Sequence, residues 1–176
     1  MNTNTTDTLR SLIRDIPDFP KPGILFRDIT TLLSDADGLR TAISALSEPF
    51  AEQSIDLVVG IEARGFILGT PVALDLGAGF VPARKAGKLP APVVSESYDL
   101  EYGSTAVEIH QDAIKPGARV LIVDDVLATG GTIRAVRSLV EQLQGEIVAI
   151  AFLVELRQLD GRRGMDGLRI ESILEY

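Results

Sequence analysis

The segment from residue 120 to residue 132 constrains the fold of this chain most. It joins an apolar run, two adjacent aspartates and a short loop rich in threonine and glycine. Beyond it, apolar side chains recur at helical spacing, which predicts an amphipathic helix; they are Ile133, Val136, Val140 and Leu143. The sequence therefore predicts a buried strand, an acidic pair, a loop and a helix, in this order, with the loop amides at the N-terminus of the helix.

The loop has the groups that bind a phosphate. Its members are Ala128, Thr129, Gly130, Gly131 and Thr132. The glycines let the backbone approach an anion closely, and the threonine hydroxyls can donate hydrogen bonds. The dipole of the following helix adds a favourable interaction with negative charge. The loop is therefore a candidate phosphate site.

The acidic pair, Asp124 and Asp125, indicates what the phosphate is attached to. Two adjacent carboxylates repel each other and resist burial without a partner. A vicinal diol relieves this, because each hydroxyl can donate to an ionised oxygen. The pair and the loop together therefore predict a ribose 5-phosphate site. An Asp-Asp pair alone favours a solvated or metal-binding acidic turn, but the longer segment favours the ribose site.

Composition excludes several classes of protein. The formal net charge of −8 argues against a nucleic-acid binder, which would present a basic face. There is no cysteine, hence no disulfide and no thiolate chemistry. The first residues lack the pattern of a signal peptide, and no apolar run approaches the ~20 residues of a membrane helix. We therefore expect a soluble, cytoplasmic protein without membrane or nucleic-acid partners.

A local basic cluster answers the question of how an acidic chain could bind a polyanion. Residues 76–95 contain no aspartate or glutamate but include Arg84, Lys85 and Lys88. Cations placed near a departing anion stabilise the transition state more than the ground state. A solvated basic turn is the alternative, and the absence of acids in this stretch favours a binding role.

The remaining pattern predicts an α/β fold in a single domain spanning residues 1–176. We expect helices over 9–16, 39–50, 64–76 and from 133, a stiff loop over 19–28, and strands over 55–61, 80–81, 106–110, 120–123 and 147–154. Gly145 is the expected end of the helix before the last strand. Alternating strands and helices indicate a mostly parallel, twisted sheet flanked by helices, with ligands at the strand C-termini.

The segment 120–132 resembles the phosphoribosyl-pyrophosphate motif of the type I phosphoribosyltransferases. Four further blocks, residues 19–30, 62–66, 84–90 and 98–103, closely resemble the adenine-specific branch of that family and occur in its order. The resemblance covers roughly residues 17 to 156 and leaves the tail from Leu159 unexplained. It implies an N-terminal base-binding hood over residues 1–50 and a core sheet over residues 55–156.

The resemblance also implies a reaction, in which adenine and phosphoribosyl pyrophosphate give AMP and pyrophosphate in purine salvage. It assigns the catalytic roles to Glu101, Asp124 and Asp125, with Glu101 as the acid or base on a mobile loop over residues 95–103. Pyrophosphate binding falls to Arg64, Gly65, Arg84, Lys85 and Lys88, and adenine binding to Leu25, Phe26, Arg27 and Leu156. Mg²⁺ is expected to be held by substrate and water without a direct protein ligand, and a homodimer is expected.

Two alternatives stay open from the sequence. A transferase for hypoxanthine, guanine or xanthine would share the diphosphate-sugar site, although the block 19–30 favours adenine. A regulatory protein could keep the phosphoribosyl site only as a ligand sensor, although neither the charge nor the length supplies a nucleic-acid surface or an extra domain.

Overall fold

The computed structural model describes residues 3–99 and 104–176. The chain divides into two compact units, Met1–Ala45 and Leu46–Tyr176. None of the helices in the described ranges has the length and apolar character that a membrane crossing requires. The prediction of one phosphoribosyltransferase domain over the whole chain stays a prediction.

The second unit is built on a seven-stranded sheet with the order β5-β6-β4-β3-β7-β8-β9. The five strands from β4 to β9 in this order run parallel, and β6 and β5 continue the sheet antiparallel. The strands are β3 (Leu57–Ile61), β4 (Gly79–Lys85), β5 (Val93–Asp99), β6 (Ser104–His110), β7 (Arg119–Leu127), β8 (Glu146–Glu155) and β9 (Ile170–Glu175). The predicted α/β fold with a mostly parallel sheet is confirmed.

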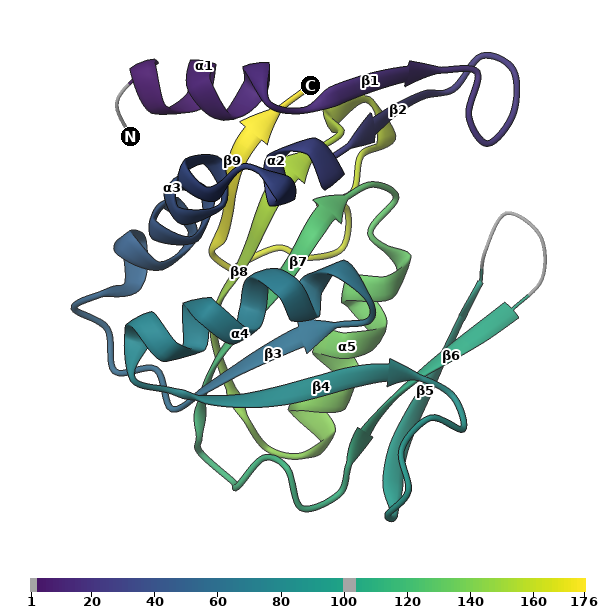
Figure 1. Cartoon of the computed structure of the whole chain (residues 1–176). Coiled ribbons are helices and arrows are strands. Elements are labelled where there is room, and N and C mark those ends of the chain that lie inside the picture. The colour runs from purple at the N-terminus through teal and green to yellow at the C-terminus, as the bar shows by residue number, and fades with distance from the viewer. Residues whose placement is uncertain (1–2, 100–103) are drawn as a thin grey trace. The chain divides into compact units, whose positions relative to one another are not determined.

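Helices cover both faces of this sheet. Figure 1 shows α4 (Arg64–Leu76) in front of the strands and α5 (Gly131–Gln142) behind them. The strands between the two helices are therefore buried on both sides, which is why they are apolar at every position rather than at alternate ones. In β7, the four residues from 120 to 123 are all 0% exposed. Burial of such a side chain stabilises the fold by roughly 1.5–3 kcal/mol. Two short 3₁₀ helices, Glu48–Phe50 and Arg157–Leu159, complete this unit.

The N-terminal unit differs from the prediction of a helix followed by a stiff loop. Its elements are α1 (Thr3–Ser11), β1 (Arg14–Pro17), β2 (Leu25–Asp28), α2 (Thr30–Ser34) and α3 (Ala36–Ser47), which ends just beyond it. The strands β1 and β2 form an antiparallel hairpin in which Ile16 pairs with Phe26. The predicted helix over 9–16 overlaps α1 only at residues 9–11, and residues 14–16 are strand instead, because pairing between strands supplies backbone hydrogen bonds that apolar spacing does not reveal.

A buried carboxylate secures the end of this hairpin. Asp28 accepts hydrogen bonds from the Arg14 guanidinium and from the backbone and hydroxyl of Thr30, at 3.0 and 2.7 Å for the latter two. These interactions, of which the Arg14 hydrogen bond has the largest effect, lower the pKa of Asp28 to about 2. The hairpin and the start of α2 are thus joined by one ionised side chain.

Three boundaries in the second unit also differ from prediction. Strand β7 continues through the acidic pair, because Asp124 pairs with Phe152 of β8 and the ladder runs on to Leu127. Part of the expected mobile loop over residues 95–103 is strand β5, and residues 100–103 lie outside the described residues. The helix before β8 turns at Gln144, which has φ +62°, rather than at Gly145. Glycine is not the only residue that adopts this left-handed conformation.

The tail, which has no usable sequence pattern, completes the sheet. It contains the 3₁₀ helix Arg157–Leu159 and the edge strand β9, which runs parallel to β8. Met165, between these elements, is 2% exposed and belongs to the main apolar core. Long-range pairing with β8, rather than local periodicity, determines this segment.

Candidate active site

The acidic pair and the predicted pyrophosphate loop meet at one edge of the sheet. Strands β3 and β7 are parallel neighbours, so their C-terminal ends lie side by side. Arg64, at the start of α4 after β3, places Nε 2.7 Å from Oδ2 of Asp125. A Cβ atom on Gly65 would lie 2.9 Å from Oδ1 of Asp124 and 2.9 Å from the Val123 carbonyl oxygen. Only glycine fits this approach of the loop to the carboxylates.

Burial disfavours the ionised form of the acidic pair. Asp125 is 5% exposed, and its backbone N–H donates to Oδ1 of Asp124 at 2.9 Å. Burial, followed by the charge of Asp125, raises the pKa of Asp124 well above its ordinary value. Burial also raises the pKa of Asp125, although the Arg64 guanidinium opposes this shift. The ligand-free protein therefore loses folding stability by ionising the pair, and hydroxyl donors from a ligand would relieve that cost.

The predicted phosphate loop connects β7 to α5 and borders a small cavity. Gly130 caps α5 with φ +79° and no side-chain hydrogen bond, so the first N–H groups of the helix have no side-chain cap. The cavity has a volume of about 80 Å³. Its lining includes Asp124, all five loop residues from 128 to 132, and Phe152. A helix N-terminus open to a polar cavity has the geometry that binds phosphate groups.

The basic cluster lies at the end of β4 and the turn that follows. Arg84 Nε lies 3.2 Å from Oε2 of Glu62, and the Lys85 backbone N–H donates to the same oxygen at 3.0 Å. Burial tends to raise the pKa of Glu62, but these hydrogen bonds outweigh it and lower the pKa. Glu108 also contacts this turn, because it accepts a hydrogen bond from Gly87 N–H at 2.9 Å. The turn therefore has acidic neighbours in the folded protein, Glu62 and Glu108, although its own stretch of sequence contains no acid. Arg84 is oriented by Glu62 and by the Lys88 carbonyl, to which its Nη1 donates at 3.1 Å.

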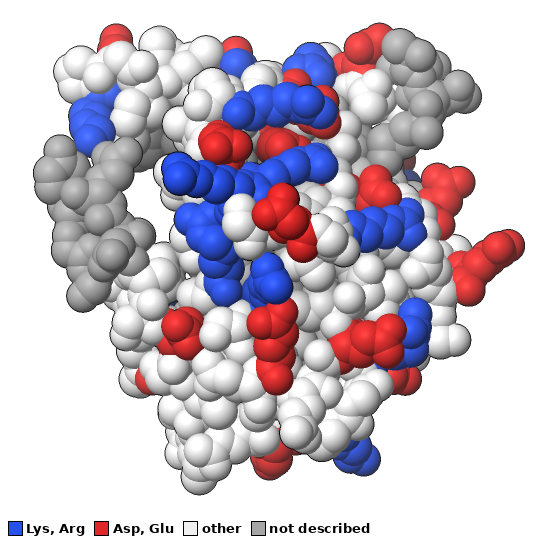
Figure 2. Space-filling view, turned by 180° about the vertical axis from the view of Figure 1, so that it is seen from behind, with Lys and Arg blue, Asp and Glu red and all other residues white. Residues whose placement is uncertain are grey.

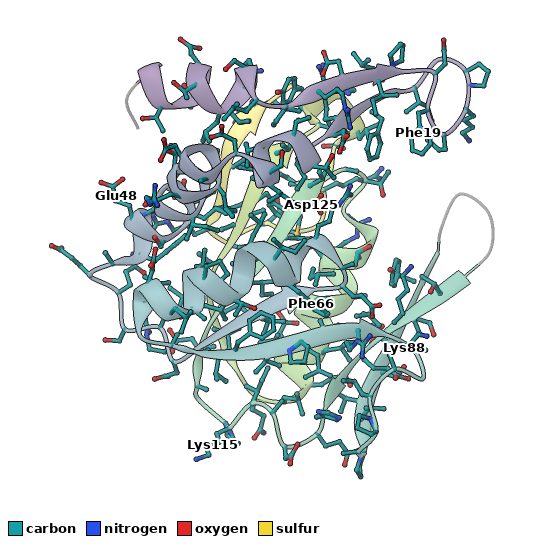
Figure 3. The ribbon with its side chains drawn as sticks, viewed as in Figure 1. Phe19, Glu48, Phe66, Lys88, Lys115 and Asp125 are labelled. Carbon is teal, nitrogen blue, oxygen red and sulfur yellow. The ribbon has the colours of Figure 1, made fainter. Side chains whose placement is uncertain are left out.

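Figure 3 locates these groups within the second unit. Asp125 and Lys88 lie toward the C-terminal ends of the strands, whereas Lys115 lies at the opposite end. Phe66 follows the pyrophosphate loop in α4 and packs edge-on against Phe80, with ring centroids 5.9 Å apart. The aromatic contact fixes the first turn of the helix that carries Arg64 and Gly65.

The three N-terminal residues predicted to bind adenine lie on β2. Leu25 and Arg27 are two positions apart in a strand that pairs only with β1, so their backbone groups point the same way. Phe26 lies between them and packs edge-on against Phe19 at 5.2 Å. Arg27 forms an ion pair with Asp15. This arrangement is compatible with backbone recognition of one edge of a base by two alternate residues.

Leu156 and Glu101 are the other two predicted residues. Leu156 directly follows β8, and its N–H donates to the Leu127 carbonyl at 2.9 Å, beside the phosphate loop. Glu101 lies outside the described residues. The roles assigned to all these residues remain predictions.

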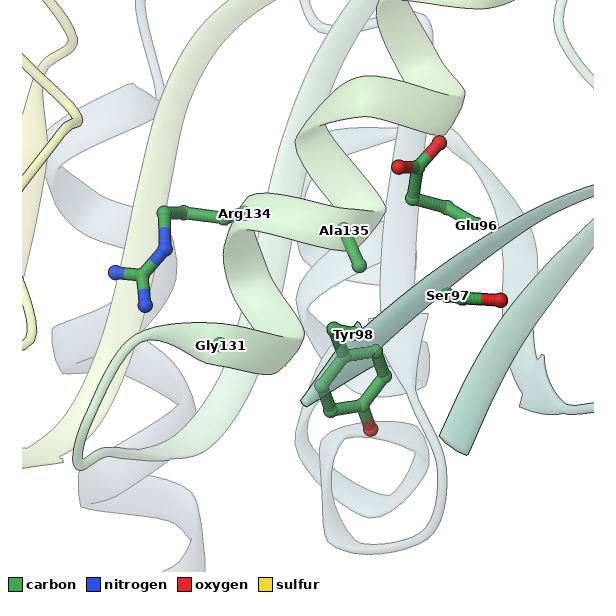
Figure 4. A pocket seen from close by; sticks show the side chains of 6 residues that line it. All are labelled: Glu96, Ser97, Tyr98, Gly131, Arg134 and Ala135. Carbon is green, nitrogen blue, oxygen red and sulfur yellow. The ribbon is translucent and has the colours of Figure 1, made fainter. Parts of the chain in front are cut away.

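The strand that leads toward Glu101 is tied to α5. Oε2 of Glu96 accepts from the Ser138 hydroxyl at 3.1 Å and from the Gln142 amide at 3.0 Å. Figure 4 shows Glu96 and Tyr98 of β5 on the side of α5, with the Ser97 side chain directed away from the helix; these residues line a pocket of about 300 Å³. The base of the predicted mobile loop is therefore attached to the helix that begins at the phosphate loop.

Charge on the surface is mixed in sign. Figure 2 shows Lys and Arg side chains on the rear face interspersed with Asp and Glu. The second unit contains four arginine–glutamate ion pairs among those described: Arg137–Glu141, Arg157–Glu175, Arg162–Glu155 and Arg169–Glu171. Such a face is unlike the single-sign stripe of a nucleic-acid binder.

Comparisons with known proteins agree with this geometry. Residues 28–172 match the phosphoribosyl transferase domain family. The chain is 58% identical over 168 residues to adenine phosphoribosyltransferase from Acaryochloris marina, which covers 96% of this chain and 99% of the relative. The solved adenine phosphoribosyltransferase of Rhodothermus marinus superposes with a TM-score of 0.94 at 54% identity, over 99% of this chain and 100% of the other.

A eukaryotic enzyme is also similar. Adenine phosphoribosyltransferase from Saccharomyces cerevisiae, solved in complex with an imino-altritol bisphosphate and adenine, is 40% identical with a TM-score of 0.92, over 98% of this chain and 99% of the other. Sequence and fold thus agree over nearly the whole length of each protein. This chain belongs to the adenine phosphoribosyltransferase family of the phosphoribosyl transferases.

Proposed function

We propose that this chain transfers the phosphoribosyl group of phosphoribosyl pyrophosphate to adenine, forming AMP and pyrophosphate in purine salvage. The observation that carries the proposal is the contact of the acidic pair with the Arg64–Gly65 loop beside the phosphate loop. The Saccharomyces cerevisiae relative was solved with adenine and a sugar-like bisphosphate, and the Giardia lamblia relative with 9-deazaadenine.

The proposed reaction is a displacement at the anomeric carbon with inversion. The bond from that carbon to pyrophosphate oxygen breaks, a bond to a ring nitrogen of adenine forms, and the nitrogen loses its proton. Asp124 and Asp125 accept hydrogen bonds from the ribose diol, and their charge favours the positive charge that develops on the ribose. Glu101 is the proposed acid or base for the purine ring: the ionised carboxylate can accept the proton, whereas donation of a proton would require a raised pKa, because an exposed glutamate is ionised at neutral pH.

The leaving pyrophosphate gains negative charge as the bond breaks. The backbone at Arg64 and Gly65 and the cations of Lys85 and Lys88 are proposed to stabilise it. Arg84 contributes from a position held by Glu62. Leu25, Phe26, Arg27 and Leu156 are the proposed adenine contacts.

Mg²⁺ is the proposed cofactor, bound through the substrate. In the described ranges no group of three or more His, Cys, Asp or Glu side chains is arranged to hold a metal ion. We propose that pyrophosphate, ribose and water oxygens would hold the ion, without a direct protein ligand. When bound, the ion would offset charge on the leaving group.

A cytoplasmic homodimer is the proposed working form, with the basic turn near the partner subunit. The family resemblance supports the dimer, and the absence of cysteine is compatible with a reducing cytosol. Light scattering after size exclusion tests the dimer: a mass near twice 18.9 kDa is expected, and a monomer at working concentration would contradict it.

A base-competition assay tests the activity. With phosphoribosyl pyrophosphate and Mg²⁺, adenine should be converted to AMP in preference to hypoxanthine, guanine and xanthine. Asp124→Asn and Asp125→Asn should each lower kcat/KM by about 10- to 100-fold, because each loses a charge-assisted bond of roughly 1.5–3 kcal/mol. Asp112→Asn, at an exposed aspartate that lines a different pocket together with Lys115 and Gly117, should act as the wild type. Preference for another purine would refute the base assignment, and substrate binding without turnover would refute the enzyme.

A further inference from the structure

We propose that Arg134 and the tail loop, residues 160–164, hold the phosphate loop in the conformation that binds the substrate 5′-phosphate. Arg134 is then a positioning residue, which acts through the backbone of the phosphate loop. The inference rests on the proposed function, since it takes residues 128–132 as the phosphate site. It gives a role to a part of the tail that neither the sequence pattern nor the reaction explains.

Arg134 connects the two loops through their backbones. Nη2 donates to the Thr129 carbonyl at 3.1 Å, and Nη1 donates to the Arg163 carbonyl at 3.1 Å. Figure 4 shows this guanidinium extending from α5 away from Glu96 and Tyr98, which line the same pocket. The planar fork of arginine can bind two acceptors at once, which is how one side chain spans both loops.

The loops also contact each other directly at two glycines. A Cβ atom on Gly130 would lie 2.2 Å from the Gly161 carbonyl oxygen, and a Cβ atom on Gly161 would lie 2.3 Å from the Ala128 carbonyl oxygen. Both distances are far shorter than a van der Waals contact between a carbon and an oxygen that are not bonded to each other. The two backbones are therefore packed against each other with no room for a side chain.

This packing determines which way the loop amides point. The carbonyls of Ala128 and Thr129 are directed toward the tail loop and Arg134. In a planar trans peptide the C=O and the following N–H point in opposite directions. The N–H groups of Thr129 and Gly130 are therefore turned away from the tail loop and are left for an anion.

The tail loop is itself anchored to the core and can act as a rigid support. Arg162 donates to both carboxylate oxygens of buried Glu155, from Nε at 2.8 Å and from Nη2 at 2.6 Å. Met165, next to the loop, is buried in the main core. Arg137 Nη1 donates to the Gly164 carbonyl at 3.1 Å. A support with these attachments restricts the phosphate loop before the ligand arrives, which lowers the entropy cost of binding.

The experiment measures the Kd of phosphoribosyl pyrophosphate with Mg²⁺ by calorimetry, and KM and kcat for both substrates. Arg134→Met should raise the Kd at least tenfold, equivalent to about 1.4 kcal/mol, with less than a twofold change in KM for adenine at saturating phosphoribosyl pyrophosphate. Arg134→Lys keeps the charge but lacks the fork, so it should not restore binding. Gly161→Ala keeps Arg134 and should weaken binding by a similar factor.

Arg119→Met is the matched control. Arg119 Nε also donates to a backbone carbonyl, that of Ser54 at 2.6 Å, but at the N-terminal end of β7. This variant should lose stability without a change in the Kd. Wild-type affinity in Arg134→Met would overturn the inference. So would wild-type affinity in both Arg134→Lys and Gly161→Ala, which would indicate that the charge alone acts. Failure of the unaltered protein to bind phosphoribosyl pyrophosphate would instead refute the proposed function.

Discussion

The buried ion pair of Glu155 and Arg162 allows a stability prediction of definite size and pH dependence. Glu155, the last residue of β8, is 4% exposed and accepts two hydrogen bonds from Arg162, at 2.8 and 2.6 Å. The Arg162 bonds are the main cause of a lowered Glu155 pKa, against the effect of burial. Glu155→Gln preserves the size of the side chain and removes its charge.

The expected loss follows from the environment of each partner. Removal of one member of a fully buried pair costs roughly 3–5 kcal/mol, and a hydrogen bond to a charged group contributes roughly 1.5–3 kcal/mol. The Arg162 side chain is 42% exposed, so water solvates the arginine that is left behind. We therefore expect Glu155→Gln to lower the free energy of unfolding by about 1.5–3 kcal/mol at neutral pH.

The pH dependence gives the prediction a second, independent measurement. Because the folded pKa of Glu155 is lowered, its stabilisation is present above the ordinary glutamate pKa of 4.5 and is lost as the pH falls through the folded value. The difference between wild type and variant should thus shrink in acid. Urea unfolding followed by circular dichroism at several pH values measures both effects.

Glu171→Gln is the matched control. Its carboxylate pairs with Arg169 Nε at 2.8 Å, but the two side chains are 38% and 39% exposed. Exposed pairs contribute at most about 1 kcal/mol, so this variant should lose less stability than Glu155→Gln. Equal losses in the two variants, or a Glu155→Gln effect that persists unchanged in acid, would refute the reasoning.

Two further predictions concern the acidic pair. Gly65→Ala should raise KM for phosphoribosyl pyrophosphate by about tenfold or more without unfolding the protein, because the added methyl would lie 2.9 Å from Oδ1 of Asp124; a wild-type KM together with a normal melting curve would contradict this. Affinity for phosphoribosyl pyrophosphate should fall in acid more steeply in the wild type than in Asp125→Asn, since the raised pKa values let the pair take up protons that compete with the ribose diol. Calorimetry across the pH range measures the affinity of both proteins. Protonation of phosphoribosyl pyrophosphate itself affects both proteins equally, so an identical pH dependence of the two affinities would exclude the acidic pair as the cause.

Local sequence was sufficient for the parts of the fold that have strong periodicity or turn chemistry. The predicted helix over 64–76 coincides with α4, and the strands before the acidic pair and over 147–154 lie within β7 and β8. Parallel strands buried on both faces are continuous apolar runs, which are visible without any partner. The meeting of the Arg64 loop with the acidic pair was also predictable, since both loops follow strands of a parallel sheet.

Other features depend on residues far apart in the chain. The hairpin of β1 and β2 and the edge strand β9 have weak local patterns and form because a partner strand supplies their hydrogen bonds. The acid-free appearance of the basic turn was misleading for the same reason, because Glu62 comes from the neighbouring strand end.

The sequence by itself determined which groups the candidate site contains and predicted its chemistry. The acidic pair, the phosphate loop and the helix that follows are consecutive, so their order alone predicts a ribose 5-phosphate site, and the resemblance of residues 19–30 adds the base. Only the tertiary structure decided how that loop is held. The contacts of Gly161 and Arg163 with the loop and with Arg134 join segments about thirty residues apart, and no local periodicity encodes such a contact. Chain order supplies the reactive groups, and packing between distant segments supplies their orientation.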